Sequence, residues 1–438
     1  MNERPLRILF VSSLFPSSVE PGRAPYNRQL IAAIARRAEV RVIAPVPWFP
    51  GQRLLRRRVL PPETETLDGL LVSHPRAFYT PGCLIHKHWR WYQKTVRAHL
   101  KETIAAYRPD HIIVGFAYPD GVAVGPLCRE WGVPYSIRVN GSDFRLRIKQ
   151  PRFRGLVLSA LRDTRLLFCP GQALKRDMAA AGIDNEKIVA FQNGINPDLF
   201  RYRTRDESVA ALRATGAWPK DLSTDTRFVL FAGHLEWVKG ADRLLRAWAI
   251  LYEAWRRECE TRLDAPLSRA RPKLLIVGRV GGGKRLRRLA RQLAIADGVR
   301  FLGERPHAEI ALWMNAAECL CLPSRSEGSP NVVVEALAVG LPVVATGVGE
   351  VPFLVKDGTS GLIVEHKYRG VSSRLAVALE STLEREFDRQ ELATAAEKPS
   401  WDEAAAGILA AVRATATGSR SAGCKKETRA ASDELRAG

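Results

Sequence analysis

Two glutamates eight positions apart, Glu327 and Glu335, are the side chains of this sequence best placed for chemistry. The apolar run Leu320-Cys-Leu-Pro323 predicts a buried strand, and Ser329 before Pro330 predicts the N-cap and first residue of a helix. A helix start offers free backbone N–H groups and a partial positive charge, so it favours a phosphate. Carboxylates before and inside the start can accept hydrogen bonds from hydroxyl groups. The segment therefore predicts a cradle for a nucleotide sugar.

The same segment resembles the donor-binding signature of the retaining GT-B glycosyltransferases, in which Glu-x7-Glu leads into Ala336-Leu-Ala-Val-Gly-Leu-Pro-Val-Val-Ala345. The resemblance covers roughly residues 6–413 by motif order. It includes Gln192-Asn-Gly-Ile-Asn-Pro-Asp-Leu-Phe200, Gly233-His-Leu-Glu-Trp-Val-Lys-Gly240 and Ser400-Trp-Asp-Glu403. The runs Ile8–Pro16, Val42–Pro50 and Phe116–Gly121 resemble more narrowly the teichuronic-acid and exopolysaccharide branch.

The resemblance implies roles for residues in the second half of the chain. Glu335 would bind the ribose and Glu327 the hydroxyl groups of the sugar, while Lys239 would stabilise the departing diphosphate without a metal. The family has an arginine where this chain has His234, and an imidazole is mostly neutral at pH 7. His234 is then either held cationic by the diphosphate or donates a single hydrogen bond. The expected donor-binding set is completed by Gly22, Gly233, Gly328, Ser329, Pro330, Asn331 and Val332.

The first half of the chain departs from the family at two glycines. Gly22 is alone in a turn where relatives usually have two or more glycines, so it either lets backbone amides approach phosphate or forms an ordinary turn. Gly115 stands where many relatives carry a catalytic histidine. The chain could therefore be inactive, use a water there, or be served by Tyr118, Asp120 or Asp143, which are the candidate acceptor contacts. For Asp143 the alternative is an exposed loop residue.

Alternating apolar runs and helical patterns predict an α/β protein with two doubly wound, Rossmann-like domains that face a cleft, with ligand at the carboxyl ends of the strands. The expected organisation is an acceptor-binding domain over 1–200, a linker over 201–226, a nucleotide-sugar-binding domain over 227–385, a helical crossover back to the first domain over 386–413 and a disordered tail over 414–438. Residues 256–272 are interpreted as an insertion.

The composition, with 46% hydrophobic and 26% charged residues in 438, is that of an ordinary globular protein. No long apolar run predicts a membrane span, and seven scattered cysteines do not form a disulfide framework, so we expect a cytosolic protein. The net charge of +21, with clusters at Arg56–Arg58 and over 138–154, suits an anionic membrane or an anionic substrate, or is simply a solvated surface. Nucleic acid is not expected, because zinc-finger spacing and RNA-binding signatures are missing from the sequence.

Other motifs leave alternatives open. Gly278-Arg-Val-Gly-Gly-Gly-Lys-Arg285 matches a nucleotide-binding P-loop up to Lys284, but Arg285 stands where a Ser or Thr must hold magnesium. His86 and His88 are interpreted as structural or surface residues rather than metal ligands. We expect no metal and no cofactor beyond the donor, whose nucleotide could be UDP or GDP, and a lipid-linked or oligosaccharide acceptor. The alternative function is a catalytically silent partner subunit that binds a nucleotide sugar.

Overall fold

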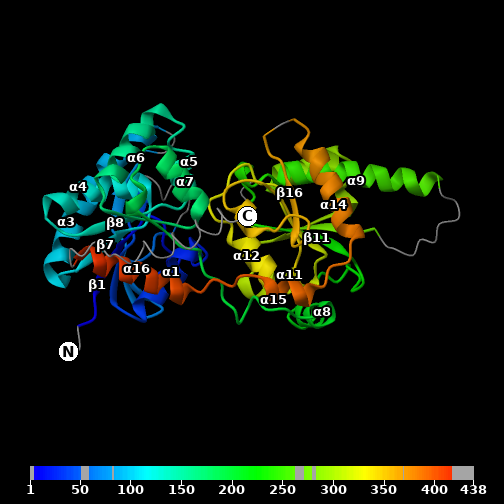
Figure 1. Cartoon of the computed structure of the whole chain (residues 1–438), viewed down its shortest axis with the longest axis horizontal. Helices are drawn as coiled ribbons and strands as arrows, with labels where there is room; N and C mark the ends of the chain where they lie inside the picture. Colours follow the sequence, from blue (N-terminus) through cyan, green and yellow to red (C-terminus); the bar gives the residue numbers. More distant parts are fainter. Residues whose placement is uncertain are drawn as a thin grey trace, which may run out of the picture. The chain divides into compact units, whose positions relative to one another are not determined.

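A computed structural model of the chain describes residues 4–50, 59–80, 83–261, 271–278, 283–367 and 369–416 (Figure 1). These residues divide into two units. Unit 1 comprises residues 1–192 together with the C-terminal segment from Trp401, and unit 2 comprises Asn193–Ser400. Each unit is built around its own sheet.

Among the described residues of unit 1, eight strands form one sheet in the order β10-β9-β8-β7-β1-β2-β5-β4. Neighbouring strands are parallel except β4 and β5, which pair antiparallel at the edge. The strands are β1 (Arg7–Val11), β2 (Glu39–Ile43), β4 (Thr64–Leu67), β5 (Leu70–Ser73), β7 (His111–Val114), β8 (Tyr135–Arg138), β9 (Leu166–Cys169) and β10 (Ile188–Ala190), with β3 (Val46–Trp48) and β6 (Arg76–Phe78) pairing separately.

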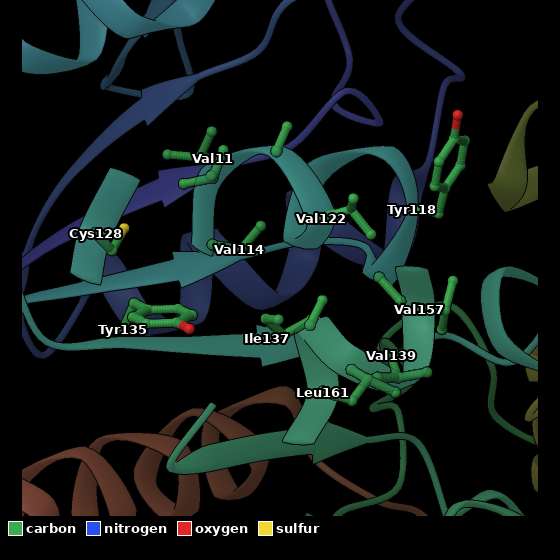
Figure 2. Close-up of a cluster of buried hydrophobic side chains, with 14 of the residues drawn as sticks. Val11, Val114, Tyr118, Val122, Cys128, Tyr135, Ile137, Val139, Val157 and Leu161 are labelled. Atoms are coloured by element: carbon green, nitrogen blue, oxygen red, sulfur yellow. The ribbon is translucent and has the colours of Figure 1, made fainter. Parts of the chain in front are cut away.

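Successive side chains of a strand point to opposite faces, and both faces of this sheet are covered by helices. Ile8 and Phe10 of β1 belong to the core beneath α1 (Pro25–Ala35) and α16 (Trp401–Ala416). Leu9 and Val11 belong to the opposite core. Figure 2 shows part of that core, where Val11 and Val114 lie near Val122. The helices of that face and of the connections are η1 (Ile85–Lys87), α3 (His88–Tyr107), η2 (Ala117–Gly121), α4 (Val122–Glu130), α5 (Ser142–Arg145), α6 (Pro151–Asp163), α7 (Gln172–Ala180) and η3 (Asn185–Lys187).

In the described part of unit 2, six parallel strands form a sheet in the order β13-β12-β11-β14-β15-β16. Their bounds are β11 (Phe228–Ala232), β12 (Lys273–Val277), β13 (Val299–Gly303), β14 (Cys319–Leu322), β15 (Val343–Thr346) and β16 (Gly361–Val364).

The two faces of this second sheet are also covered. Phe228 and Leu230 pack on the side of α8 (Arg205–Ala214), α11 (His307–Ala316) and α12 (Asn331–Ala338). Val229 and Phe231 pack on the side of α9 (Ala241–Thr261), α10 (Gly283–Gln292) and α14 (Val371–Glu384). The remaining helices are η4 (Trp237–Lys239), η5 (Ala296–Gly298), α13 (Val351–Leu354) and α15 (Arg389–Ala395).

The observed organisation differs from the expected one between the two sheets. Residues 201–226, expected as a linker, contain α8, whose Val209 and Leu212 are buried in the core of unit 2. The segment from Asn193 to residue 200 also belongs to unit 2, because Ile195 and Phe200 join that core. The expected crossover over 386–413 is divided, with α15 in unit 2 and α16 in unit 1. Parts of the expected insertion and tail, residues 262–270 and 417–438, lie outside the described residues.

Candidate functional site

The expected donor-binding residues of the second half all lie in unit 2, near the carboxyl ends of two adjacent strands. Gly233 and His234 directly follow β11, and Lys239 closes the short helix η4. The loop to Glu327 follows β14. Because β11 and β14 are parallel neighbours, their carboxyl ends meet at one edge of the sheet, which is where α/β folds bind ligands.

Lys239 and Glu327 form an ion pair. The Lys239 Nζ lies 2.8 Å from each carboxylate oxygen of Glu327, and the Ser324 hydroxyl donates to Oε1 at 2.5 Å. Glu327 is buried with 7% of its surface exposed, so the pair is partly removed from water. The structure therefore brings together the two residues that were expected to bind the sugar and the diphosphate.

The loop that carries Lys239 is fixed to the loop that carries Glu327. Gly240 has a φ of 72°, and a Cβ there would lie 2.1 Å from the carbonyl oxygen of Pro323, so only glycine allows this close approach. The Arg325 guanidinium donates to both carboxylate oxygens of Asp242 at 2.8 and 2.7 Å and lies 4.4 Å from the centre of the Trp237 ring. These contacts hold the ammonium group of Lys239 beside the carboxylate.

The start of α12 differs from the sequence-based expectation. The expected N-cap at Ser329 is wrong, because Pro330 occupies the N-cap position with extended backbone and α12 begins at Asn331. The backbone amides of Gly328, Ser329, Asn331 and Val332 make no hydrogen bond within the described residues. Pro330 has no N–H, so it contributes shape but no donor.

Two polar side chains, those of Ser329 and Asn331, also lie at this helix start. The Ser329 hydroxyl is shielded from solvent and has no hydrogen-bond partner in the part of the chain that the structure describes. The side chain of Asn331 is held by Asn193, whose amide donates to it at 2.9 Å. A helix start with unpaired amides next to a lysine is suited to bind a diphosphate.

Glu335 lies on the second turn of α12 and pairs with a histidine that the sequence analysis did not single out. Its Oε1 is 2.8 Å from Nε2 of His307, and it is buried with 8% exposed. The His307 ring also packs edge-on against Phe200, with 4.8 Å between ring centres. Burial lowers the pKa of His307, but the hydrogen bond and charge of Glu335 outweigh it and raise the pKa above 6.5. The two residues are 28 positions apart, so no local spacing in the sequence predicts that they pair.

His234 is exposed and makes no hydrogen bond or ion pair with the described residues. It stands two residues beyond the end of β11, on the same loop as Lys239. Whether it acts as a cation or as a single hydrogen-bond donor stays a prediction.

In unit 1, the environment of Gly115 explains why no histidine is present. A Cβ at Gly115 would lie 2.5 Å from the Ser12 hydroxyl oxygen and 2.7 Å from the Phe10 ring. Both neighbours are buried in the sheet, so neither has room to move. The space that a histidine side chain would need is therefore filled by β1 and the residue after it.

The three candidate acceptor residues are buried. The hydroxyl of Tyr118 donates to the carbonyl of Ile85, and burial raises the pKa of Tyr118 to about 12. Asp120 accepts a hydrogen bond from the Ser13 amide at 2.9 Å, and burial raises its pKa to about 6. Asp143 accepts from the amides of Ala117 and Asn140 at 2.8 and 2.9 Å, and burial raises its pKa as well. The interpretation of Asp143 as an exposed loop residue is therefore wrong.

Three other residues named from the sequence, Gly22, Arg138 and His88, lie in unit 1. Gly22 is exposed in the turn between β1 and α1. Arg138, counted in the basic surface cluster, is fully buried and donates to Asn27 at 2.5 Å. His88 caps a turn through Nε2, 3.0 Å from the Cys83 carbonyl oxygen, which is a structural role. Arg56–Arg58 and residues 279–282, which are half of the P-loop-like segment, lie outside the described residues.

Comparison with known proteins agrees with this arrangement. Two family models match consecutive parts of the chain, Glycosyltransferase Family 4 over residues 22–199 and Glycosyl transferases group 1 over residues 216–399. A D-inositol 3-phosphate glycosyltransferase of Streptomyces scabiei (strain 87.22) is 30% identical over 325 residues, which cover 70% of this chain and 68% of that protein. The chain belongs to the group 1 glycosyltransferases.

This glycosyltransferase is also 24% identical to the putative teichuronic acid biosynthesis glycosyltransferase TuaC of Bacillus subtilis (strain 168), over 87% of this chain and 89% of TuaC. Its fold is similar to that of HepE from Anabaena, solved in complex with UDP and glucose. The TM-score is 0.65 at 19% identity, covering 93% of this chain and all of HepE. The predicted α/β GT-B fold, with two Rossmann-like domains, is therefore confirmed.

No group of three or more His, Cys, Asp or Glu side chains among the described residues of the glycosyltransferase is arranged to hold a metal ion. Among the helices that the structure describes, none has the length and apolarity needed to cross a membrane.

Proposed function

We propose that the chain transfers a sugar from a nucleotide-diphosphate donor to a lipid-linked glycan, with retention of anomeric configuration and without a metal. The observation that carries the proposal is the Lys239–Glu327 ion pair beside the unpaired amides at the start of α12. A half-buried cation and a set of free N–H groups favour a diphosphate, and adjacent carboxylates accept hydrogen bonds from sugar hydroxyls.

In the proposed mechanism the diphosphate binds against Lys239 and the amides of Gly328 and Ser329. Lys239 then exchanges part of its contact with Glu327 for the phosphate, which frees carboxylate oxygens for the hydroxyls of the sugar. The bond between the anomeric carbon and the phosphate oxygen breaks with its electron pair on the diphosphate. The acceptor oxygen bonds to the same carbon, and its proton leaves with the diphosphate. Stabilising the negative charge on the leaving group is the main task of the site.

UDP sugars are the first donors to test, because HepE, which shares the fold, was solved with UDP and glucose. GDP sugars are the alternative. Glu335 is proposed to hold the ribose, a part that both donor classes share.

The acceptor is proposed to bind unit 1, and the setting to be cell-surface polysaccharide synthesis on the cytoplasmic side of a membrane. The similarity to TuaC, a putative teichuronic acid biosynthesis glycosyltransferase, supports this setting.

The test is a donor screen with the purified full chain, in which released nucleoside diphosphate is measured with extracted lipid-linked glycans as acceptor. We expect release with one donor class, and its loss in Glu327→Gln. No release with any UDP or GDP sugar would contradict the proposal.

A second candidate function is a catalytically silent subunit that binds a nucleotide sugar. The filled space at Gly115 favours it, because no histidine can reach the reacting sugar from that strand. Donor binding by calorimetry without any turnover, under all acceptor conditions, would identify the silent protein. A P-loop enzyme predicts instead magnesium-dependent nucleotide binding that Lys284→Ala abolishes, and unchanged binding in that variant excludes it.

A further inference from the structure

Two segments of unit 1 carry cations but no acidic residue. They are residues 83–101, which include η1 and the first half of α3, and residues 144–162, which run from α5 through α6. Within each segment no acidic side chain offsets the positive charge, although Arg97 and Arg145 form ion pairs with Glu130 and Asp177 of other elements.

Tyr118 of η2 joins the two segments. Its hydroxyl donates to the Ile85 carbonyl in the first segment, and its ring packs edge-on against Phe153 of the second, with 4.9 Å between ring centres. The Arg147 guanidinium lies 5.4 Å from the centre of the same ring. Figure 2 shows Tyr118 at the edge of the buried cluster, with its hydroxyl pointing away from it. The two segments are thus neighbours on one part of unit 1.

Large apolar side chains are exposed at this junction. Leu84, Ile85 and Leu146 are 47%, 44% and 39% exposed. Leu84 has a left-handed backbone with φ of 50°, in the turn that begins η1. Exposed aliphatic side chains that gather on one part of a surface can mark a site that contacts a membrane or a partner.

Exposed cations lie close in sequence to these side chains. Lys87 and Arg90 lie within six residues of Leu84, and Lys149 lies three residues after Leu146. None of the three forms an ion pair with a described residue. We name the set Leu84, Ile85, Lys87, Arg90, Leu146 and Lys149 the η1–α5 surface.

We propose that the η1–α5 surface docks on an anionic lipid bilayer, with the aliphatic side chains entering the interface and the cations on lipid phosphates. Apolar tips ringed by Lys and Arg are the pattern of interfacial membrane binding. A soluble polyanion such as nucleic acid would satisfy the cations but leave Leu84 and Ile85 in water. The inference rests on the proposed function in that a lipid-linked acceptor is presented at such a membrane.

The position of the surface suits that acceptor. Tyr118 and Asp120 belong to the same short element, η2, and Asp120 is bonded to the Ser13 amide just beyond the end of β1. A bilayer on the η1–α5 surface would therefore lie close to the carboxyl ends of the unit 1 strands.

The test is co-sedimentation of the full chain with vesicles of phosphatidylcholine alone or mixed with phosphatidylglycerol. We expect binding to the mixed vesicles only. Lys87→Glu/Lys149→Glu should lower the partition coefficient by about tenfold or more. Leu84→Asn/Ile85→Ser should also lower it, chiefly at high salt, where charge attraction is screened. Asn is chosen at position 84 because it tolerates the left-handed backbone.

A matched control is Arg285→Glu/Arg288→Glu on α10 of unit 2. It changes the net charge equally, and both arginines are exposed and form no ion pair with described residues. We expect it to keep binding within about twofold of wild type, since it alters only the general charge. Equal losses in the control and in the Lys87/Lys149 variant would overturn the proposal.

Two other outcomes also decide against a bilayer. Wild-type protein that does not sediment with mixed vesicles contradicts it. Binding that salt abolishes and that Leu84→Asn/Ile85→Ser leaves unchanged would identify a polyanion-binding surface instead. Donor turnover in solution, measured in parallel, separates these results from a failure of the proposed function, because it requires no vesicle.

Discussion

His307 at the start of α11 and Glu335 in α12 lie 2.8 Å apart between Nε2 and Oε1, which fixes one oxygen of a buried carboxylate. The other oxygen, Oε2, has no hydrogen bond from a described residue, so it is left to accept one from a ligand hydroxyl. Phe200 packs against the imidazole and limits its rotation. His307 is therefore a positioning residue for the carboxylate that we propose to hold the ribose.

His307→Ala should raise the KM for the donor by about 3- to 10-fold, the effect of losing one orienting hydrogen bond, and change kcat little. His307→Gln, which can still donate, should restore most of the KM. Steady-state kinetics on both variants measures this split. A large fall in kcat with unchanged KM would place His307 in the chemical step instead.

Glu335→Ala should weaken donor binding by about 1–3 kcal/mol, because it removes the acceptor of a charge-assisted hydrogen bond. Calorimetric titration with the nucleoside diphosphate measures the loss. Wild-type affinity in this variant would refute the assigned contact with the ribose.

The same pair predicts a pH dependence of stability. The pKa of His307 is raised in the folded protein, so its contribution to the free energy of unfolding is fully present below the unfolded pKa and is lost as the pH rises through the folded value. The stability difference between wild type and His307→Gln should thus be larger near pH 6 than near pH 8.5. Urea unfolding at the two pH values checks it, and a difference that grows with pH would be inconsistent with the pair.

Removing one partner of the Lys239–Glu327 pair should cost more than removing both. Lys239→Met leaves a buried carboxylate without its cation, and we expect a loss of about 1–3 kcal/mol, reduced from the fully buried case because Lys239 is partly exposed. Lys239→Met/Glu327→Gln should regain part of that loss. A double-mutant cycle by denaturant unfolding measures the coupling, and additive losses would show that the pair contributes nothing.

Gly240→Ala should destabilise unit 2 and reduce donor turnover, because its Cβ would meet the Pro323 carbonyl oxygen at 2.1 Å. Gly216→Ala is the matched control, since Gly216 has a φ of 71° but nothing within 4 Å of its Cβ. The control should lose only about 1–2 kcal/mol from the left-handed backbone. Thermal unfolding and turnover of the two variants separate the cost of the left-handed backbone from the cost of the clash with Pro323. Equal effects in both variants would show that the close approach of Gly240 to Pro323 is unimportant.

Burial of Asp120 predicts that the free energy of unfolding falls as the pH rises, which is the opposite of the effect of a salt-bridged carboxylate with a lowered pKa. The pKa of Asp120 is raised to about 6 from 3.8, so the folded state binds the proton more tightly and stability falls as the pH rises between these values. Asp120→Asn keeps an acceptor for the Ser13 amide without the charge. The free energy of unfolding of this variant, relative to that of wild type, should rise by up to about 3 kcal/mol between pH 4 and pH 7. Denaturant unfolding across this range tests the sign.

The sheets could be predicted from sequence because their strands are buried on both faces and appear as continuous apolar runs. The predicted buried strand Leu320–Pro323 overlaps β14 (Cys319–Leu322) in all but its last residue. The strands β3, β4 and β6 were not predicted because they are short and only half buried. The helix α6 was not predicted, and only its first four residues fall in the segment 138–154, which was interpreted by its charge.

The candidate site could be predicted only where its residues fall in one local pattern. Glu327 and Lys239 were both identified, but their direct contact depends on the pairing of β11 with β14, which no local spacing reveals. His307 was missed for the same reason. The N-cap was misplaced because Ser329 has the right side chain, yet Pro330 takes the extended backbone that ends the loop.

The helix α16 lies against α1 within unit 1 (Figure 1), with Ile408 and Leu409 in the core and Asp402 bonded to Arg36 at 3.1 Å. The first sheet therefore cannot bury this face while the ribosome is still translating unit 2. Until α16 has been synthesised, Ile31 and Ile34 of α1 lack part of their cover, so the nascent chain has an interval in which aggregation competes with completion of unit 1.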